Sequence, residues 1–209
     1  MTTSLIILAA ILFVILERLL QKKKNQKILR EDFFDDFAMY TSAQNYILST
    51  LIFGVIIDFI DNSTGISRLQ LFAKIPIWAQ LIFFVVTHDL YIYWTHRWMH
   101  KNKWLWRLHR LHHSSEKLNT LALGKFNVID IFLEIFIISV GLVLIQLPEN
   151  VFFAAQSFMI PATILSHSNF DVKLPSWLKW VIITPTSHRI HHSINQLEHD
   201  SNYGGFSHF

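Results

Sequence analysis

The chain has 209 residues, of which 52% are hydrophobic and only 16% are charged, and its mean hydropathy is +0.34. This composition is typical of a membrane protein and argues against a water-soluble globule or a disordered chain. The absence of cysteine excludes disulfides, cysteine-ligated zinc and cysteine-ligated iron–sulfur clusters, so any metal must be held by nitrogen or oxygen. The net charge of +3 comes from basic residues interleaved with tryptophan beside apolar segments, so no nucleic-acid partner is expected.

Five apolar stretches are long enough, or nearly so, to cross a hydrocarbon core that needs ~20 helical residues. In chain order they are approximately 4–20, 42–60, 75–94, 128–147 and 151–167. The first has no positive segment before it and no small-residue cleavage site after it, which predicts an uncleaved anchor. Only Pro148, Glu149 and Asn150 join the last two, which predicts a tight helical hairpin, with a re-entrant pair as the alternative. We therefore expect an all-α integral membrane protein with four to five transmembrane or re-entrant helices.

Lysine and arginine indicate the orientation of these helices, because both accumulate on the cytoplasmic side of membrane proteins. Segments 18–30, 95–127 and 168–209 carry six, seven and three of them, whereas the loops at 61–74 and 148–150 carry only Arg68 and Lys74. With five spans, the three basic segments share one face. The histidine clusters fall on the same face, which predicts a multi-pass protein with a cytoplasmic histidine-rich helical cap.

Eight of the twelve histidines form three clusters: His96-Arg-Trp-Met-His100, His109-Arg-Leu-His112-His113 and His188-Arg-Ile-His191-His192. On a helix, residues i and i+4 lie about 40° apart, and i and i+3 about 60° apart in the other direction. Each cluster is therefore expected to present its imidazoles on one narrow face. Crowded neutral imidazoles are costly to desolvate unless each nitrogen has a partner, so the pattern predicts a metal site.

Eight histidines are enough for two metals with four or five ligands each. Arginine follows the leading histidine of each five-residue cluster, so no His-Glu-x-x-His protease motif is present, and no Glu-x-x-His pair of a carboxylate-bridged di-iron bundle is present either. Bis-histidine haem binding would need one or two facing pairs rather than three dense clusters. A histidine-rich membrane metal-binding or transport protein without oxygenase activity is the alternative from another class, although its ligands should be spread along the spans.

Around these clusters the sequence contains further motifs, listed here in order: Asp89-Leu-Tyr-Ile-Tyr-Trp-Thr before the first cluster, His167-Ser-Asn169, Thr184-Pro185 before the third cluster, and Asp200-Ser-Asn-Tyr-Gly204. With them, residues 80–209 resemble the fatty acid hydroxylase / sterol desaturase superfamily, the histidine-cluster membrane di-iron oxygenases. The resemblance implies N-terminal membrane anchor helices in 1–74 and a catalytic domain in 75–209. Family members continue with Trp-Asp and Phe-Gly-Thr elements, so the domain is expected to be truncated at its C-terminus.

The resemblance implies an iron-dependent oxidoreductase, a membrane-bound non-haem di-iron oxygenase. It would hydroxylate or desaturate a lipid, sterol, fatty acyl or related, with dioxygen as co-substrate and an external electron donor of the cytochrome or ferredoxin type. Two iron ions are the implied cofactors, and zinc is an adventitious substitute. The implied metal ligands are His96, His100, His109, His112, His113, His167, His188, His191 and His192.

Residues near the clusters carry separate expectations. Asp89 lies seven positions before His96, about 20° away on the helix, so its carboxylate is expected to face the metals and orient an imidazole. Asn169 is expected to hold a metal-bound water, with a helix C-cap as the alternative. His88 is about 80° from that face and is expected to make a structural hydrogen bond. Three acids could either orient a metal ligand or lie on the solvated surface: Glu116, Glu198 and Asp200.

Overall fold

The computed structural model describes residues 2–24, 47–114, 128–144, 146–193 and 195–205, with the single positions Lys27, Leu29, Phe33, Phe34 and Leu118. Within these residues all regular structure is helical, which confirms the expected all-α class. Glu116 and residues 206–209 lie outside the described residues, so the predictions made for them are not addressed by the structure.

Among the described residues, helices occupy most of each of the five predicted apolar stretches. They are α1 (Thr2–Leu19), the run of α3 (Ser49–Leu51), η2 (Ile52–Ile57) and α4 (Asp58–Thr64), then α5 (Ile77–Lys101), the run of α7 (Val128–Ser139) and η5 (Val140–Leu144), and α8 (Glu149–His167). The segments η2 and η5 are π-helical, which the hydropathy pattern did not predict. Shorter elements complete the fold: η3 (Ile66–Leu69), α6 (Lys103–His113), η6 (Leu178–Trp180), α9 (Pro185–His191) and α10 (Gln196–His199).

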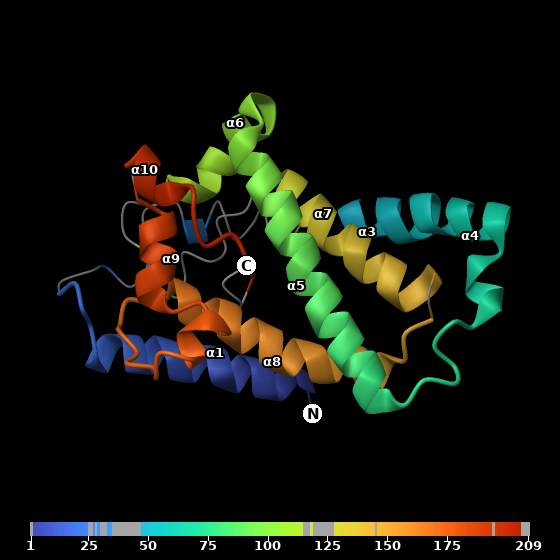
Figure 1. Ribbon diagram of the computed structural model, residues 1–209, viewed down its shortest axis with the longest axis horizontal. Coiled ribbons are helices and arrows are strands. Elements are labelled where there is room, and N and C mark those ends of the chain that lie inside the picture. Colours follow the sequence, from blue (N-terminus) through green and yellow to red (C-terminus); the bar gives the residue numbers. More distant parts are fainter. Residues whose placement is uncertain are drawn as a thin grey trace.

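The long helix α5 runs through the middle of the molecule, and α7 and α8 both pack against it (Figure 1). The predicted hairpin has its short turn before α8, but α7 and α8 diverge from that turn. The apolar core is accordingly in two parts, one around Phe84, Val151 and Met159 and the other around Ile52 and Ile131. Helix α1 lies along α8. Of the helices in the described residues, α5 is the one that is long and apolar enough to cross a membrane.

The chain turns sharply between α5 and α6 at Asn102, whose backbone is extended. The Asn102 side chain accepts hydrogen bonds from the backbone N–H groups of Trp104, at 2.9 Å, and Leu105, at 3.2 Å. This is a helix N-cap, which satisfies donors that would have no partner inside α6. Thr184 caps α9 in the same way by accepting from Ser187, and Pro185 takes the first helical position. These caps fix the starts of the two helices that carry the second and third histidine clusters.

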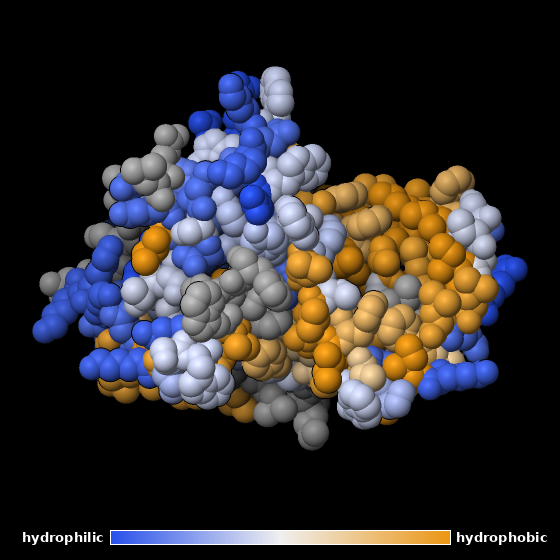
Figure 2. All heavy atoms as spheres, viewed as in Figure 1, coloured by the Kyte–Doolittle hydropathy of each residue, from blue (hydrophilic) through white to orange (hydrophobic). Residues whose placement is uncertain are grey.

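Apolar and polar side chains gather at different ends of the molecule. In Figure 2 apolar residues cover the face formed by α3, η2, α4 and the adjoining part of α5, whereas polar residues cover α6, α9 and α10. Ile82, Val86, Leu90 and Trp94 of α5 are all exposed and follow one another at i, i+4 spacing. They therefore form an apolar stripe along α5. Trp94 and His96 are two residues apart, so their side chains point about 160° apart, and the stripe ends on the side of α5 away from the first histidine cluster.

Candidate metal centre

The nine predicted ligands lie together, in two groups. The five-histidine group contains His96, His100, His109, His113 and His191, and the four-histidine group contains His112, His167, His188 and His192. Within each group, every side chain offers one ring nitrogen, and these nitrogens all lie within 4.8 Å of one another. The groups adjoin, since the rings of His113 and His192 stack with their centroids 4.3 Å apart. Two groups of five and four imidazoles offer the number of nitrogens that the two predicted metals would need, while metal binding itself stays a prediction.

Each cluster was expected to present its imidazoles on one face. This is confirmed for His96 and His100, but the second and third clusters are each divided between the two groups. On α6, His109 and His113 belong to the five-histidine group, and His112 belongs to the other. On α9 the division is reversed, since only His191 joins the five-histidine group. The physical reason is that consecutive helical residues point about 100° apart, so paired histidines at i+3 and i+4 diverge toward two different centres.

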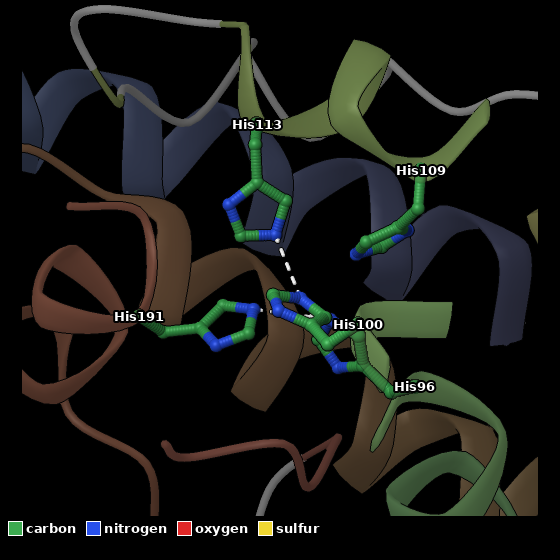
Figure 3. A group of neighbouring side chains, drawn as sticks. All are labelled: His96, His100, His109, His113 and His191. Atoms are coloured by element: carbon green, nitrogen blue, oxygen red, sulfur yellow. Dashed lines mark hydrogen bonds between the residues drawn. The ribbon is translucent and has the colours of Figure 1, made fainter. Parts of the chain in front are cut away.

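Backbone carbonyls fix the tautomers of two ligands in the five-histidine group. His96 Nδ1 donates to the carbonyl oxygen of Tyr203 at 2.9 Å, and His191 Nδ1 donates to that of Ser201 at 2.7 Å. Since a carbonyl oxygen only accepts, the proton of each neutral ring is on Nδ1 and Nε2 carries a lone pair. These two Nε2 atoms lie 3.0 Å apart, facing each other (Figure 3). Two facing lone pairs repel unless a cation lies between them, so this geometry fits a metal ion.

In the four-histidine group, too, ring nitrogens converge with their lone pairs facing one another. His167 Nδ1 lies 2.9 Å from the carbonyl oxygen of Thr163, which leaves its Nε2 as an acceptor. His188 Nε2 lies 2.9 Å from that atom and 3.1 Å from Nε2 of His192. A single N–H on His188 can donate to one of these neighbours only. The three converging nitrogens therefore lack enough protons to satisfy one another, whereas one metal ion would satisfy all three.

Asp130 orients His109, a role that the sequence analysis missed. The Asp130 carboxylate, in the first turn of α7, accepts a hydrogen bond from His109 Nδ1 at 3.1 Å, and both side chains are buried. Nε2 of His109 is buried without a hydrogen-bond partner in the described part of the chain. A carboxylate behind an imidazole with a free inner nitrogen is the usual support of a metal ligand. The signal was present in the sequence as an acid inside a predicted span.

The electrostatic environment favours the neutral form of four of the predicted ligands outside the predicted spans. Burial, and then the proximity of neighbouring imidazoles, lowers the pKa of His113, His188, His191 and His192 well below the ordinary value for histidine. The neutral ring is the form that binds a metal. Near neutral pH these four side chains are therefore ready to act as ligands without first losing a proton.

Asp89 is fully buried, and its recorded partner comes from the end of the described chain. Its carboxylate accepts a hydrogen bond from the backbone N–H of Gly205 at 2.9 Å. Tyr203, two residues earlier, supplies the carbonyl that orients His96. Asp89 thus anchors the segment whose Tyr203 carbonyl orients His96. Through this segment it orients an imidazole indirectly. A direct contact of its carboxylate with an imidazole stays a prediction.

Substitutions of Asp89 distinguish its anchoring of Gly205 from a direct contact with an imidazole. Asp89→Ala is expected to weaken metal binding by the five-histidine group, on the order of tenfold or more, because it releases the segment around Tyr203. Asp89→Asn keeps an oxygen that can accept from Gly205, so it is expected to retain most of the affinity. Competition of each variant with a chelator, followed by metal analysis, measures this. Equal losses in both variants would instead indicate that the negative charge acts on an imidazole.

Asn169 is tied to the segment that follows α1. Its side-chain Nδ2 donates to the Lys23 carbonyl at 2.9 Å, and its Oδ1 accepts from the Lys23 N–H at 3.2 Å. Its own N–H lies 3.4 Å from the buried carboxylate of Glu17. The C-cap of α8 is Ser168, so the C-cap alternative for Asn169 is wrong. The contacts connect the N-terminal region to the end of α8, while a role in holding a metal-bound water stays a prediction.

The remaining polar neighbours have separate partners. His88 Nε2 hydrogen-bonds the Glu134 carboxylate at 3.2 Å, which confirms the structural role expected for it. Asp200 lies against the five-histidine group, with Oδ1 3.5 Å from His100 Nδ1, whereas the exposed Glu198 accepts a hydrogen bond from Asn195. Of these two acids, only Asp200 belongs to the surroundings of the metal ligands.

Comparison with known proteins agrees with this geometry. The family model for fatty acid hydroxylases matches residues 81–209, which contain all nine histidines of the two groups. The chain belongs to the fatty acid hydroxylase family. This confirms the resemblance recorded from the histidine clusters and the motifs around them.

The relatives are lipid-modifying enzymes by name. The ornithine lipid hydroxylase OlsE of Rhizobium tropici is 33% identical over 129 residues, which are 62% of this chain and 39% of that protein. The alkylglycerol monooxygenases of Xenopus tropicalis and Homo sapiens are 33% and 30% identical, over 56% of this chain and 26% of each of those proteins. The chain therefore spans less than two fifths of the length of these relatives. No solved structure matches it.

Proposed function

We propose that the chain carries the catalytic centre of a membrane-bound non-haem di-iron oxygenase that hydroxylates a lipid. The observation that carries this proposal is the pair of buried groups in which imidazole lone pairs converge without enough protons to satisfy them. Nitrogen donors suit iron, and they also suit zinc as an adventitious substitute. Bound iron would supply the activation of dioxygen with two electrons from an external donor. The names of the relatives favour hydroxylation over desaturation.

The chain's own residues hold and position the reactants in this proposal. The carbonyls of Tyr203 and Ser201 and the carboxylate of Asp130 aim three imidazoles inward, so the site needs little reorganisation on binding metal. The exposed apolar stripe on α5 gives this helix a surface that can lie against the lipid chains of the bilayer. The electron donor, a soluble or membrane-bound cytochrome or ferredoxin, would approach from the polar side, over α6.

The proposed membrane arrangement has several passes and places the metal centre on the cytoplasmic face, with 1–74 as anchor helices and 75–209 as the catalytic domain. The asymmetry of lysine and arginine and the apolar face over α3, η2 and α4 support it. A protease is expected to reach a tag placed after residue 209 only from the cytoplasmic side of sealed vesicles. Cleavage from the opposite side alone would contradict the orientation.

The function is tested by metal content and product together. Full-length protein purified in detergent after growth with added iron is expected to hold about two metal ions per chain. With a reducing partner, ¹⁸O₂ and ether-lipid or ornithine-lipid substrates, it is expected to place labelled oxygen in the lipid. The double variant His112→Ala/His113→Ala, which removes one ligand from each group, is the control. Two bound irons with unlabelled lipids throughout would contradict the oxygenase and favour the metal-binding alternative.

A further inference from the structure

A third cluster of ligand-type side chains lies beside the five-histidine group, nearer the surface. It consists of His100, His199 and Asp200, and we call it the outer group; one ligand atom from each residue lies within 4.8 Å of the others. Two histidines and one carboxylate are a ligand set that holds divalent iron with open coordination positions, and they suit zinc as well. His199, at the end of α10, is a histidine for which the sequence predicted no role.

His100 is shared between the outer group and the five-histidine group. Its Nε2 lies 3.1 Å from Nε2 of His113. Its Nδ1 lies 3.5 Å from Asp200 Oδ1 and is buried with no hydrogen-bond partner among the described residues. A neutral imidazole has one nitrogen lone pair, so His100 can bind an ion in only one of the two groups at a time. When His100 binds an ion of the five-histidine group, an ion in the outer group is left with His199 and Asp200 as ligands, which makes its binding weak.

The outer group connects the surface with the buried centre. The side chain of Asp200 is 32% exposed, that of His199 is 15% exposed, and that of His100 is fully buried. Asp200 is also paired with the exposed ammonium of Lys101, which competes with any cation for the carboxylate. An ion bound here is therefore in contact with both water and a ligand of the five-histidine group, and it is held by fewer ligands than in either buried group.

Neighbouring side chains hold the outer group in position. The ring of His199 stacks on the Trp106 indole at 5.3 Å between centroids and 13° between planes, and the same indole contacts His100 at 4.9 Å. The Tyr203 hydroxyl donates to Asp200 Oδ1 at 3.1 Å. The three ligands are thus oriented by contacts that do not depend on an ion.

We propose that the outer group is a third, weaker metal site through which divalent transition-metal ions enter the five-histidine group. An ion first binds Asp200, His199 and Nδ1 of His100, and His100 then binds it through Nε2 after its ring proton moves to Nδ1. Ion binding by the outer group stands on its own residues, whereas the destination of the ion rests on the proposed function.

The test is a titration of the metal-stripped, full-length chain in detergent with Co²⁺, followed by absorption and by ion count. Wild-type protein is expected to bind two ions tightly and a third weakly. His199→Phe keeps a ring on Trp106 but removes both nitrogens. It is expected to keep the two tight ions, lose the weak one, and load the five-histidine group on the order of tenfold more slowly. Glu198→Gln, a change at the neighbouring exposed acid, is expected to behave as wild type.

A second variant acts in the opposite direction. Lys101→Ala removes the cation paired with Asp200 and is expected to tighten the third ion without changing the other two. The proposal is overturned if wild-type protein binds no third ion, or if His199→Phe matches wild type in ion count and loading rate. Loss of the weak ion with unchanged loading would overturn the entry role. If the buried groups bind nothing, a weak ion lost in His199→Phe still supports the outer group while the proposed function fails.

Discussion

His191→Ala is expected to remove the ion of the five-histidine group and to leave the ion of the four-histidine group, so that the metal content falls from about two ions to about one. The reason is that His191 Nε2 faces His96, whereas its neighbour His192 faces His188. His188→Ala is expected to show the reverse selectivity. Activity is expected to fall by about 100-fold or more in both variants, because the proposed oxygen chemistry needs both ions.

Elemental analysis gives the ion count, and spectra of Co²⁺-loaded protein show which group has lost its ion. His88→Gln is the matched control, because His88 is equally buried but bonds Glu134 outside both groups. It is expected to retain both ions. A loss of both ions in each alanine variant would contradict two separate sites and indicate a single shared one. Full retention in both would refute the ligand assignment.

Asp130→Asn is expected to lower the metal affinity of the five-histidine group by about 10-fold to 100-fold. The charged carboxylate fixes the tautomer of His109 and increases the electron density on its Nε2, and the neutral amide does this less well. Chelator competition measures the change. Asp58→Asn, which alters an exposed acid that bonds only Asn62 among the described contacts, is the control and is expected to have no effect. Unchanged affinity in Asp130→Asn would show that the contact is only structural.

Sequence spacing predicted that these histidines lie together, because pairs one turn apart on a helix are local. His96 and His100 lie one turn apart on α5, as their i, i+4 spacing requires. The same spacing could not show that His112 and His113 bind in different groups. That division depends on where α5, α8 and α9 lie around α6, which is set by packing between segments far apart in the chain.

The partners of the polar neighbours were hidden for the same reason. Asp89 was singled out as an acid within a predicted span, and it is fully buried, but Gly205, which donates to it, lies 116 residues away. Asp130 was overlooked because one acid at the start of an apolar stretch has no local pattern, and its role appears only when α7 packs against α6. Helix positions followed from hydropathy, whereas the π-helical segments η2 and η5 depend on tertiary packing that hydropathy does not report.

The reciprocal division of ligands on α6 and α9 has an evolutionary consequence. Each of these two helices contributes histidines to both groups, so the placement of neither helix would depend on a single metal ion. A descendant that loses the ligands of one group still has both helices fixed by the other. Chains with a single metal are therefore accessible steps in the descent of this fold, and a new ligand or a new chemistry can arise at the other position while the helices stay in place.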